Sequence, residues 1–317
     1  MSPSVLVIGA GVQGLTTGIV LAEAGWSVRL RTEVRPRETT SAAAGALWGP
    51  SSTGPDDPLC RWSLRTHAEL VSLAEQESTG VRLVSGCMAA RFDLGAQPPE
   101  EAEQIPDLRR CAPGELPDGF VSGFRGTIPL IDMPRYLDYL AQRFQQAGGE
   151  LSVSPVTCLD DAASEAGTVV NCTGVGAREL VGDPEVHAVR GQSVVVRNPG
   201  VDEYFLEIGM GSEFTAYLPH GEAVVLGGVE EHDDWRAEPV RADTVGILER
   251  CAAVEPAFSE AEVLEERVGF RPGRSSVRLE VEQHRGARLV HNYGHASLGV
   301  TLSWGCADEA AQLAVGG

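Results

Sequence analysis

The C-terminal part of the chain carries the side chains best suited to do chemistry. Arg271 stands beside Pro272, which stiffens the backbone there, and a guanidinium group can hold a carboxylate through two parallel hydrogen bonds. Downstream, the string Asn292 to Ala307 begins as a loop of small residues and runs into an apolar, alanine-rich segment. We expect that segment to be a helix whose N-terminal N–H groups and positive dipole face a ligand. The two strings therefore predict a site that holds a carboxylate over an electron-rich ring.

A nucleotide-binding pattern opens the chain. The apolar run Val5 to Ile8 leads into a glycine turn, GAGVQG, at residues 9–14. A helical stretch from Leu15 to Ala24 and a strand from Ser27 to Arg31 follow it. The glycine motif alone would be a weak signal, but in this strand–turn–helix–strand order it predicts a dinucleotide-binding unit.

Each glycine of the turn has its own expected role. Gly9 permits the tight turn, Gly11 lets the backbone approach a pyrophosphate, and Gly14 allows the helix to pack closely on the strand. Glu33, just past the second strand, is the candidate for the ribose hydroxyls, and a solvated surface glutamate is the alternative. The turn thus predicts where the phosphates of a dinucleotide lie.

Several further strings are shared with one family. They are Thr39-Thr-Ser41 with Leu47-Trp48, Asn171-Cys-Thr-Gly174, Arg190-Gly-Gln192, Arg271-Pro272, and Asn292-Tyr-Gly-His295 followed by Gly299-x-Thr301-Leu-x-Trp304-Gly305. In these strings the chain resembles the D-amino acid oxidase family, and the resemblance covers nearly the whole sequence. It implies FAD rather than NAD as cofactor, because NAD enzymes have no counterpart of the Thr39 to Trp48 stretch that would lie along the flavin ring.

The resemblance also implies a reaction. A hydride passes from the α-carbon of a D-amino acid to flavin N5, and oxygen takes up the electrons to give hydrogen peroxide. The imino acid then hydrolyses to a 2-oxo acid and ammonia. The cofactor supplies this chemistry and the protein supplies orientation, so no side chain needs to act as a general base.

The order of the expected elements alternates nucleotide-binding units with excursions. This order predicts an α/β fold in which a doubly wound FAD-binding domain is interleaved with a mixed-sheet substrate-binding domain. The FAD-binding parts are residues 1–55, 131–184 and 266–317, and the substrate-domain parts are residues 56–130 and 185–265.

The glycine turn and the resemblance together place FAD, held without a covalent bond, on several separate segments. The expected cofactor-binding residues are Gly9, Ala10, Gly11, Val12, Gln13, Gly14, Glu33, Thr39, Thr40, Ser41, Gly45, Ala46, Leu47, Val156, Leu298, Gly299, Val300 and Thr301.

Three residues receive catalytic roles. Arg271 would clamp the substrate carboxylate, the backbone carbonyl of Ser297 would accept a hydrogen bond from the amine, and Tyr217 would bind the carboxylate. Tyr217 lies one residue closer to the following proline than in relatives, so Ala216 is the alternative occupant of that place. Ala296 and Ser297 replace two glycines of the relatives, so the local backbone differs if a glycine there has a positive φ.

The side-chain pocket is expected to contain Leu47, Gly49 and Glu230. The resemblance places Gly49 where some relatives carry a polar pocket residue, and its lack of a side chain implies extra space in the substrate pocket. Glu230 would repel acidic side chains and attract those of D-Arg, D-Lys or D-ornithine. The alternative is that Glu230 belongs to a solvated turn with the acidic residues that follow it.

Other functions stay open. A glycine or sarcosine oxidase belongs to the same superfamily, an NAD-dependent dehydrogenase rests only on the first glycine motif, and an inactive flavin-binding module is permitted by the departures at Tyr217 and Ala296. We expect His295 to hold the shape of its loop and Cys172 to pack in the core.

Composition excludes several classes. All 25 basic residues are arginine, so no lysine is present for a Schiff base or a phosphate-binding loop. A formal net charge of −20 argues against nucleic acid and anionic membrane as partners. No apolar run is long enough for a membrane span and no metal-ligand cluster is visible. From the residues at the two ends we expect neither export nor a peroxisomal address, and the seven unpatterned cysteines suit a reducing cytoplasm. The expected partners are a small D-amino acid and O2, and a homodimer stays open.

Overall fold

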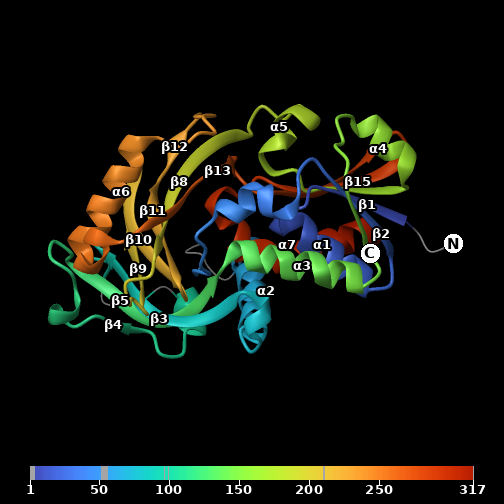
Figure 1. The fold of residues 1–317 in the computed structure, drawn as a ribbon. Coiled ribbons are helices and arrows are strands. Elements are labelled where there is room, and N and C mark those ends of the chain that lie inside the picture. The colour runs from blue at the N-terminus through green and yellow to red at the C-terminus, as the bar shows by residue number, and fades with distance from the viewer. Residues whose placement is uncertain (1–3, 51–55, 96, 99, 210, 317) are drawn as a thin grey trace.

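The computed structural model, which describes residues 4–50, 56–95, 97–98, 100–209 and 211–316, is built around two sheets (Figure 1). The first sheet has six strands in the order β14-β15-β7-β1-β2-β6. Its strands are β1 (Ser4–Ile8), β2 (Ser27–Thr32), β6 (Glu150–Val153), β7 (Thr168–Asn171), β14 (Arg278–His284) and β15 (Ala287–Tyr293). All neighbours are parallel except β14, which pairs antiparallel with β15 at one edge.

Helices cover both faces of the first sheet because its central strands are apolar on both faces. In β1, Val5 and Val7 join one core cluster, whereas Leu6 and Ile8 join another, as expected for side chains that alternate along a strand. The first face carries α1 (Val12–Glu23), α3 (Met133–Gln146) and α7 (Gly299–Val315), with α2 (Pro58–Leu73) packed on α7. The second face carries α4 (Leu159–Glu165).

The second sheet has nine strands and is mixed, since β3 and β9 are parallel and its other pairs are antiparallel. Its strands are β3 (Val81–Ala90), β4 (Arg109–Arg110), β5 (Ser122–Ile131), β8 (His187–Arg197), β9 (Tyr204–Ile208), β10 (Glu213–His220), β11 (Ala223–Val229), β12 (Glu231–His232) and β13 (Val263–Gly273). Helix α6 (Arg241–Val254) packs on the outer face of this sheet, and Ile247 and Cys251 meet Val194, Val224 and Leu226 there (Figure 1).

The remaining helices are short. They are α5 (Ala177–Leu180) and the 3-10 segments Pro36–Glu38, Thr40–Ala43, Glu77–Thr79, Glu100–Gln104, Pro113–Glu115, Gly174–Gly176, Pro256–Glu260 and Ala296–Leu298. None of the helices in the described part of the chain combines the length and the apolar character that crossing a bilayer requires.

The α/β fold class with its mixed sheet is confirmed, while the domain boundaries stay a prediction. Strand β13 pairs with β8 as far as Gly273, so the second sheet extends past the boundary expected at residue 266. Helix α2, expected in the substrate domain, packs against α7 of the first sheet. The boundary expected after residue 55 falls outside the described residues.

Candidate active site

A cavity of about 1010 Å³ lies where the two sheets meet, and residues of both sheets line it. This volume is at the upper end of the range for ligand sites, which suits a dinucleotide together with a small substrate. The structure brings these expected site residues to the cavity: Gly9, Ala10, Gly11, Val12, Gln13, Glu33, Thr39, Thr40, Ser41, Gly45, Ala46, Leu47, Gly49, Val156, Glu230, Arg271, Ser297, Leu298, Gly299, Val300 and Thr301. Gly14 and Tyr217 are not among its lining residues.

The glycine turn between β1 and α1 is tightly built. Gly9 has a φ of +104°, and a Cβ at Gly14 would come within 1.8 Å of the Gly9 carbonyl oxygen, so a side chain at either position is disfavoured. Gly14 therefore allows α1 to pack closely on the glycine turn, and it does not line the cavity. A Cβ at Gly11 would meet Ser41 Oγ at 2.9 Å, and the Val12 N–H donates to that oxygen at 3.0 Å. Ser41 thus lies close to the turn from the 3-10 segment Thr40–Ala43.

Two helices direct their N-termini into the cavity. The Gln13 side chain in the first turn of α1 donates from Nε2 to the Gly299 carbonyl at the start of α7, at 2.8 Å. Val12 and Val300, in the first turns of α1 and α7, both line the cavity. The N–H groups of a first helical turn lack partners within the helix, and the helix dipole adds partial positive charge there. This end of the cavity is therefore suited to anionic or electron-rich ligand atoms.

The lining also contains buried polar atoms that suit FAD. Gln13 Oε1 and His295 Nε2 are buried and have no hydrogen-bond partner among the described residues. Burial lowers the pKa of His295 to about 3, so the imidazole is neutral at physiological pH. Buried polar atoms are normally paired, and a ligand rich in carbonyl, amide and hydroxyl groups would pair these two. The unpaired polar atoms, the glycine turn and the cavity volume together fit FAD.

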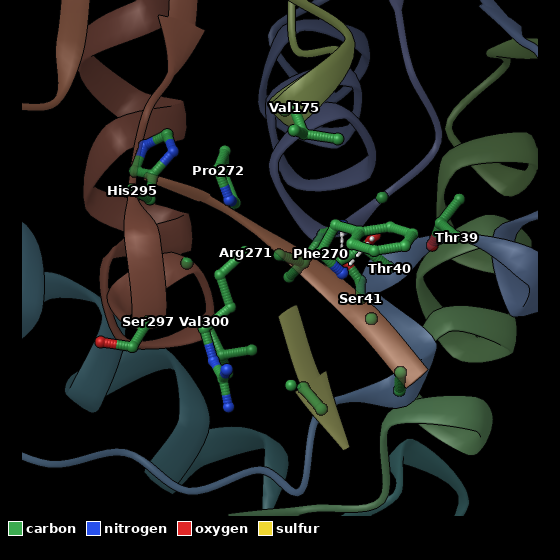
Figure 2. A pocket seen from close by; sticks show the side chains of 18 of the residues that line it. Thr39, Thr40, Ser41, Val175, Phe270, Arg271, Pro272, His295, Ser297 and Val300 are labelled. Carbon is green, nitrogen blue, oxygen red and sulfur yellow. Dashed lines mark hydrogen bonds between the residues drawn. The ribbon is translucent and has the colours of Figure 1, made fainter. Parts of the chain in front are cut away.

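Arg271 extends from β13 toward the start of α7, beside Ser297 and Val300 (Figure 2). Its guanidinium lies over Gly191 of β8, where a Cβ would be 2.4 Å from Arg271 Nη1. Its partners are weak: Nε is 3.6 Å from Glu230 Oε1, and Nη1 donates to the Val229 carbonyl at 3.4 Å. Burial lowers the pKa of Arg271 and Glu230 opposes that shift, yet the group stays charged. A charged, poorly paired guanidinium in a cavity is suited to bind a carboxylate.

The expectation that Tyr217 binds the carboxylate is wrong in this structure. The Tyr217 ring packs on the far side of the sheet, 5.4 Å from the Phe205 ring and 5.3 Å from the Phe258 ring. The neighbours that line the cavity from β10 are Phe214, Ala216 and Leu218, in the alternation of a strand. Ala216, the alternative named from the sequence, lines the cavity instead of Tyr217.

Glu230 lines the cavity and is separated from the acidic residues that follow it. Glu231 pairs with the buried Arg190 at 2.5 Å, and Asp234 pairs with Arg236. The carboxylate of Glu230 is 35% exposed and faces Arg271. The acidic turn on the surface is thus formed by the residues that follow Glu230, and Glu230 itself belongs to the cavity.

Ala296 adopts a left-handed backbone conformation, with a φ of +47°. The backbone at this position is therefore of the kind that favours glycine, although the residue is alanine. Ala296 begins the 3-10 segment Ala296–Leu298, in which the Leu298 N–H donates to the His295 carbonyl at 2.9 Å. Ala296 thus adopts the backbone conformation of this turn at the cost of local strain.

Gly191, Leu206 and Phe214 are among the lining residues that sequence reasoning missed. The strand alternation that places Ala216 in the cavity would also have indicated Phe214. Gly191 lies within the recognised Arg190-Gly-Gln192 string, but its contact with Arg271 depends on the pairing of β8 with β13.

A cavity that joins a glycine turn and two helix N-termini to a mixed sheet is typical of enzymes that bind a dinucleotide cofactor. Comparison with known proteins specifies the cofactor, because the model of the DAO family of FAD-dependent oxidoreductases matches residues 4–313. The chain belongs to this family, and it is an FAD-dependent oxidoreductase. The match rules against the nicotinamide alternative.

Similar proteins cover the chain almost completely. It is 44% identical to a D-amino-acid oxidase of Rubrobacter xylanophilus over 310 residues, which are 98% of this chain and 95% of that protein. It is also 44% identical to a D-amino-acid oxidase of Streptomyces coelicolor, over 98% of this chain and 96% of that protein. The crystal structure of glycine oxidase from Geobacillus kaustophilus has a TM-score of 0.82, with 21% identity over 98% of this chain and 94% of that one.

Proposed function

We propose that this protein oxidises D-amino acids to 2-oxo acids, with release of ammonia and hydrogen peroxide. The observation that carries the proposal is the charged, poorly paired Arg271 beside the N-terminus of α7. Two relatives that match nearly the whole chain are named D-amino-acid oxidases, which supports the same activity. The chemistry that bound FAD supplies is acceptance of a hydride from the α-carbon and passage of the electrons to oxygen.

The protein's own residues bind and orient the substrate. Arg271 holds the α-carboxylate through two hydrogen bonds, which fixes the face of the α-carbon that meets the ring. The Ser297 carbonyl accepts a hydrogen bond from the substrate amine. The N-terminal N–H groups of α7 and its dipole would stabilise negative charge on bound, reduced FAD. The apolar side chains of Leu47, Leu206 and Phe214 limit access of water.

The remaining cofactor-binding roles follow from position along the cavity. The turn at residues 9–13 and the hydroxyls of Thr39, Thr40 and Ser41 would hold the phosphates and the ribityl chain. Glu33 would bind the ribose, and the backbone at Val156 would meet the adenine. The segment from Gly45 to Leu47 and the residues from Leu298 to Thr301 would border the flavin ring.

The visible spectrum tests the activity directly. The purified protein, kept free of oxygen, receives a mixture of D-amino acids; a second sample receives the L-mixture, and a third receives glycine and sarcosine. Loss of the yellow flavin band with the D-mixture alone supports the proposal. Loss of the band only with glycine or sarcosine would instead assign the alternative amine oxidase activity, and loss with neither would leave a flavin-binding module.

Oxygen as acceptor, a homodimeric assembly and a cytoplasmic location are also part of this proposal. Peroxide formation in air tests the acceptor, and light scattering on the purified protein tests the dimer. The location is supported by cysteine usage that suits a reducing compartment. Fractionation of cells that produce the protein tests it.

A further inference from the structure

Two of the carboxylate residues that line the cavity, Glu207 and Glu230, have very different surroundings. Glu207 accepts hydrogen bonds from Arg91 Nε at 2.7 Å and from the Thr215 N–H at 3.0 Å. Within the described ranges, the side chain of Glu230 has one charged partner, Arg271, at 3.6 Å. The negative charge of Glu207 is thus compensated by Arg91 and the Thr215 N–H, which would not bind the substrate. The negative charge of Glu230 is compensated by Arg271, the residue that would bind the substrate carboxylate.

A carboxylate that binds Arg271 changes this balance. The guanidinium of Arg271 then pairs with the carboxylate of the ligand. The negative charge of Glu230 lies beside that ligand in the cavity and has lost its partner. A ligand with a second, positive group can compensate that charge, whereas a ligand with a second carboxylate adds repulsion. Glu230 is therefore placed to sort carboxylate ligands by the charge of the rest of the molecule.

The wall of the cavity that β10 and β11 form is apolar and built from small residues and one phenylalanine. Ala216 places only a methyl group where a tyrosine was expected, and Gly227 and Gly228 carry no side chain. Phe214 covers these glycines, since a Cβ at Gly228 would be 2.8 Å from its Cζ. An apolar wall that leads to an acidic group matches a side chain with an aliphatic stem and a cationic end.

We infer that Glu230 makes this protein select D-amino acids with basic side chains over those with acidic side chains. The inference rests on the proposed function, because it takes Arg271 to hold the α-carboxylate. It adds the substrate class and names Glu230 as the residue that determines it.

Three carboxylates of equal chain length test the inference without turnover: 6-aminohexanoate, hexanoate and adipate. Each offers one carboxylate to Arg271, and their far ends are positive, neutral and negative. Their dissociation constants for the FAD-loaded protein are measured from the change in flavin absorbance. We expect 6-aminohexanoate to bind about two- to five-fold more tightly than hexanoate, and adipate to bind more weakly by a similar factor.

The variant Glu230→Gln should bring the three constants close together. The matched control is Glu213→Gln, because Glu213 on β10 is 63% exposed, pairs with Arg250 at 3.2 Å and does not line the cavity. It removes the same charge nearby and should preserve the order of the ligands. An unchanged order in Glu230→Gln, or equal loss of the order in Glu213→Gln, overturns the inference.

A kinetic arm separates this inference from the proposed function. The ratio of kcat/KM for D-Arg to that for D-Met should fall about two- to five-fold in Glu230→Gln, while D-Met itself stays a substrate. Oxidation of D-Met with an unchanged ratio overturns the inference alone. If the order of the three ligands depends on Glu230 but the protein oxidises no D-amino acid, the proposed activity alone is overturned. If none of the three carboxylates binds, the result counts against both the inference and the proposed function.

Discussion

The guanidinium of Arg271 lies directly over the α-carbon of Gly191, on the neighbouring strand. A Cβ at Gly191 would be 2.4 Å from Nη1 and 2.7 Å from Cζ, and the three nearest atoms all belong to Arg271. Because the contact is with the far end of a flexible side chain, the fold can accept a methyl group there while the guanidinium must move. The position of Arg271 therefore depends on the absence of a side chain at Gly191.

Gly191→Ala should raise KM for D-amino acids at least about ten-fold, because a displacement of the carboxylate clamp by 1 Å or more disrupts substrate orientation. Thermal stability and FAD content should change little. The matched control is Gly273→Ala on β13, where a Cβ would displace the His187 ring, 2.4 Å away and outside the cavity. Equal KM values for the two variants would show that Gly191 does not position Arg271.

Arg271→Ala should lower kcat/KM by a factor that corresponds to at least ~3 kcal/mol of transition-state stabilisation, since a buried carboxylate would lose its charged partner. FAD content, measured from the absorbance ratio, should persist. Arg274→Ala and Arg278→Ala are the comparisons, because both arginines pair with Asp183 and neither lines the cavity. These two variants should lower the melting temperature and leave kcat/KM close to that of the wild type. A large loss of kcat/KM in either of them, with a mild loss in Arg271→Ala, would refute the assignment of the clamp.

Ala296→Gly should raise the free energy of unfolding by about 0.5–1 kcal/mol. Relief of the left-handed backbone at φ +47° exceeds the extra entropy that glycine has in the unfolded chain. Ala141→Gly, within helix α3, should lower it by about 1 kcal/mol. Urea unfolding of both variants measures the difference, and destabilisation by Ala296→Gly would contradict the strain argument.

FAD should leave the protein when it unfolds. Cys306 does not line the cavity, and burial raises the pKa of the lining residue Cys172 to about 12, so its thiol is neutral and unreactive at pH 7. Precipitation with acid should therefore transfer the yellow colour to the supernatant. Colour retained in the washed pellet would indicate a covalent bond.

Stability should fall below neutral pH, in part because of His295. Its folded pKa of about 3 lies below the unfolded value near 6.5, so the unfolded chain binds a proton that the folded chain does not. Above about 6.5 the two states bind equally; between about 6.5 and 3 the free energy of unfolding drops by up to ~1.4 kcal/mol per pH unit. His295→Gln should flatten this slope in urea unfolding between pH 7.5 and 5.5, whereas the surface variant His284→Gln should preserve it.

The sequence predicted the parts of the site that local backbone geometry determines. Gly9 and Gly11 form the turn because only that arrangement connects β1 closely to α1, and the strings around Arg271 and Gly299 reach one cavity. The prediction for Tyr217 was wrong because the sequence does not say which face of β10 meets the cavity. Strand alternation groups Phe214, Ala216 and Leu218 on one face and Tyr217 on the other, and tertiary packing decides which of the two faces lines the site.

The pairing of Arg271 with Glu230 was equally inaccessible. The sequence indicated each residue separately, yet their distance follows from the antiparallel pairing of β13 with β8 and from the end of β11. Contacts between strands that are distant in the chain are set by tertiary packing and not by any periodicity.

The hydrogen bond from Gln13 to Gly299 spans 286 positions of the chain. Helix α1 is synthesised long before α7, so the two helix N-termini that face the cavity cannot both be present until the chain has been made past Gly299. The growing polypeptide therefore folds without the stabilisation that a bound ligand gives to the native state. FAD would then have little stabilising effect on a chain that has not yet reached α7, and its effect would begin once both helices are in place.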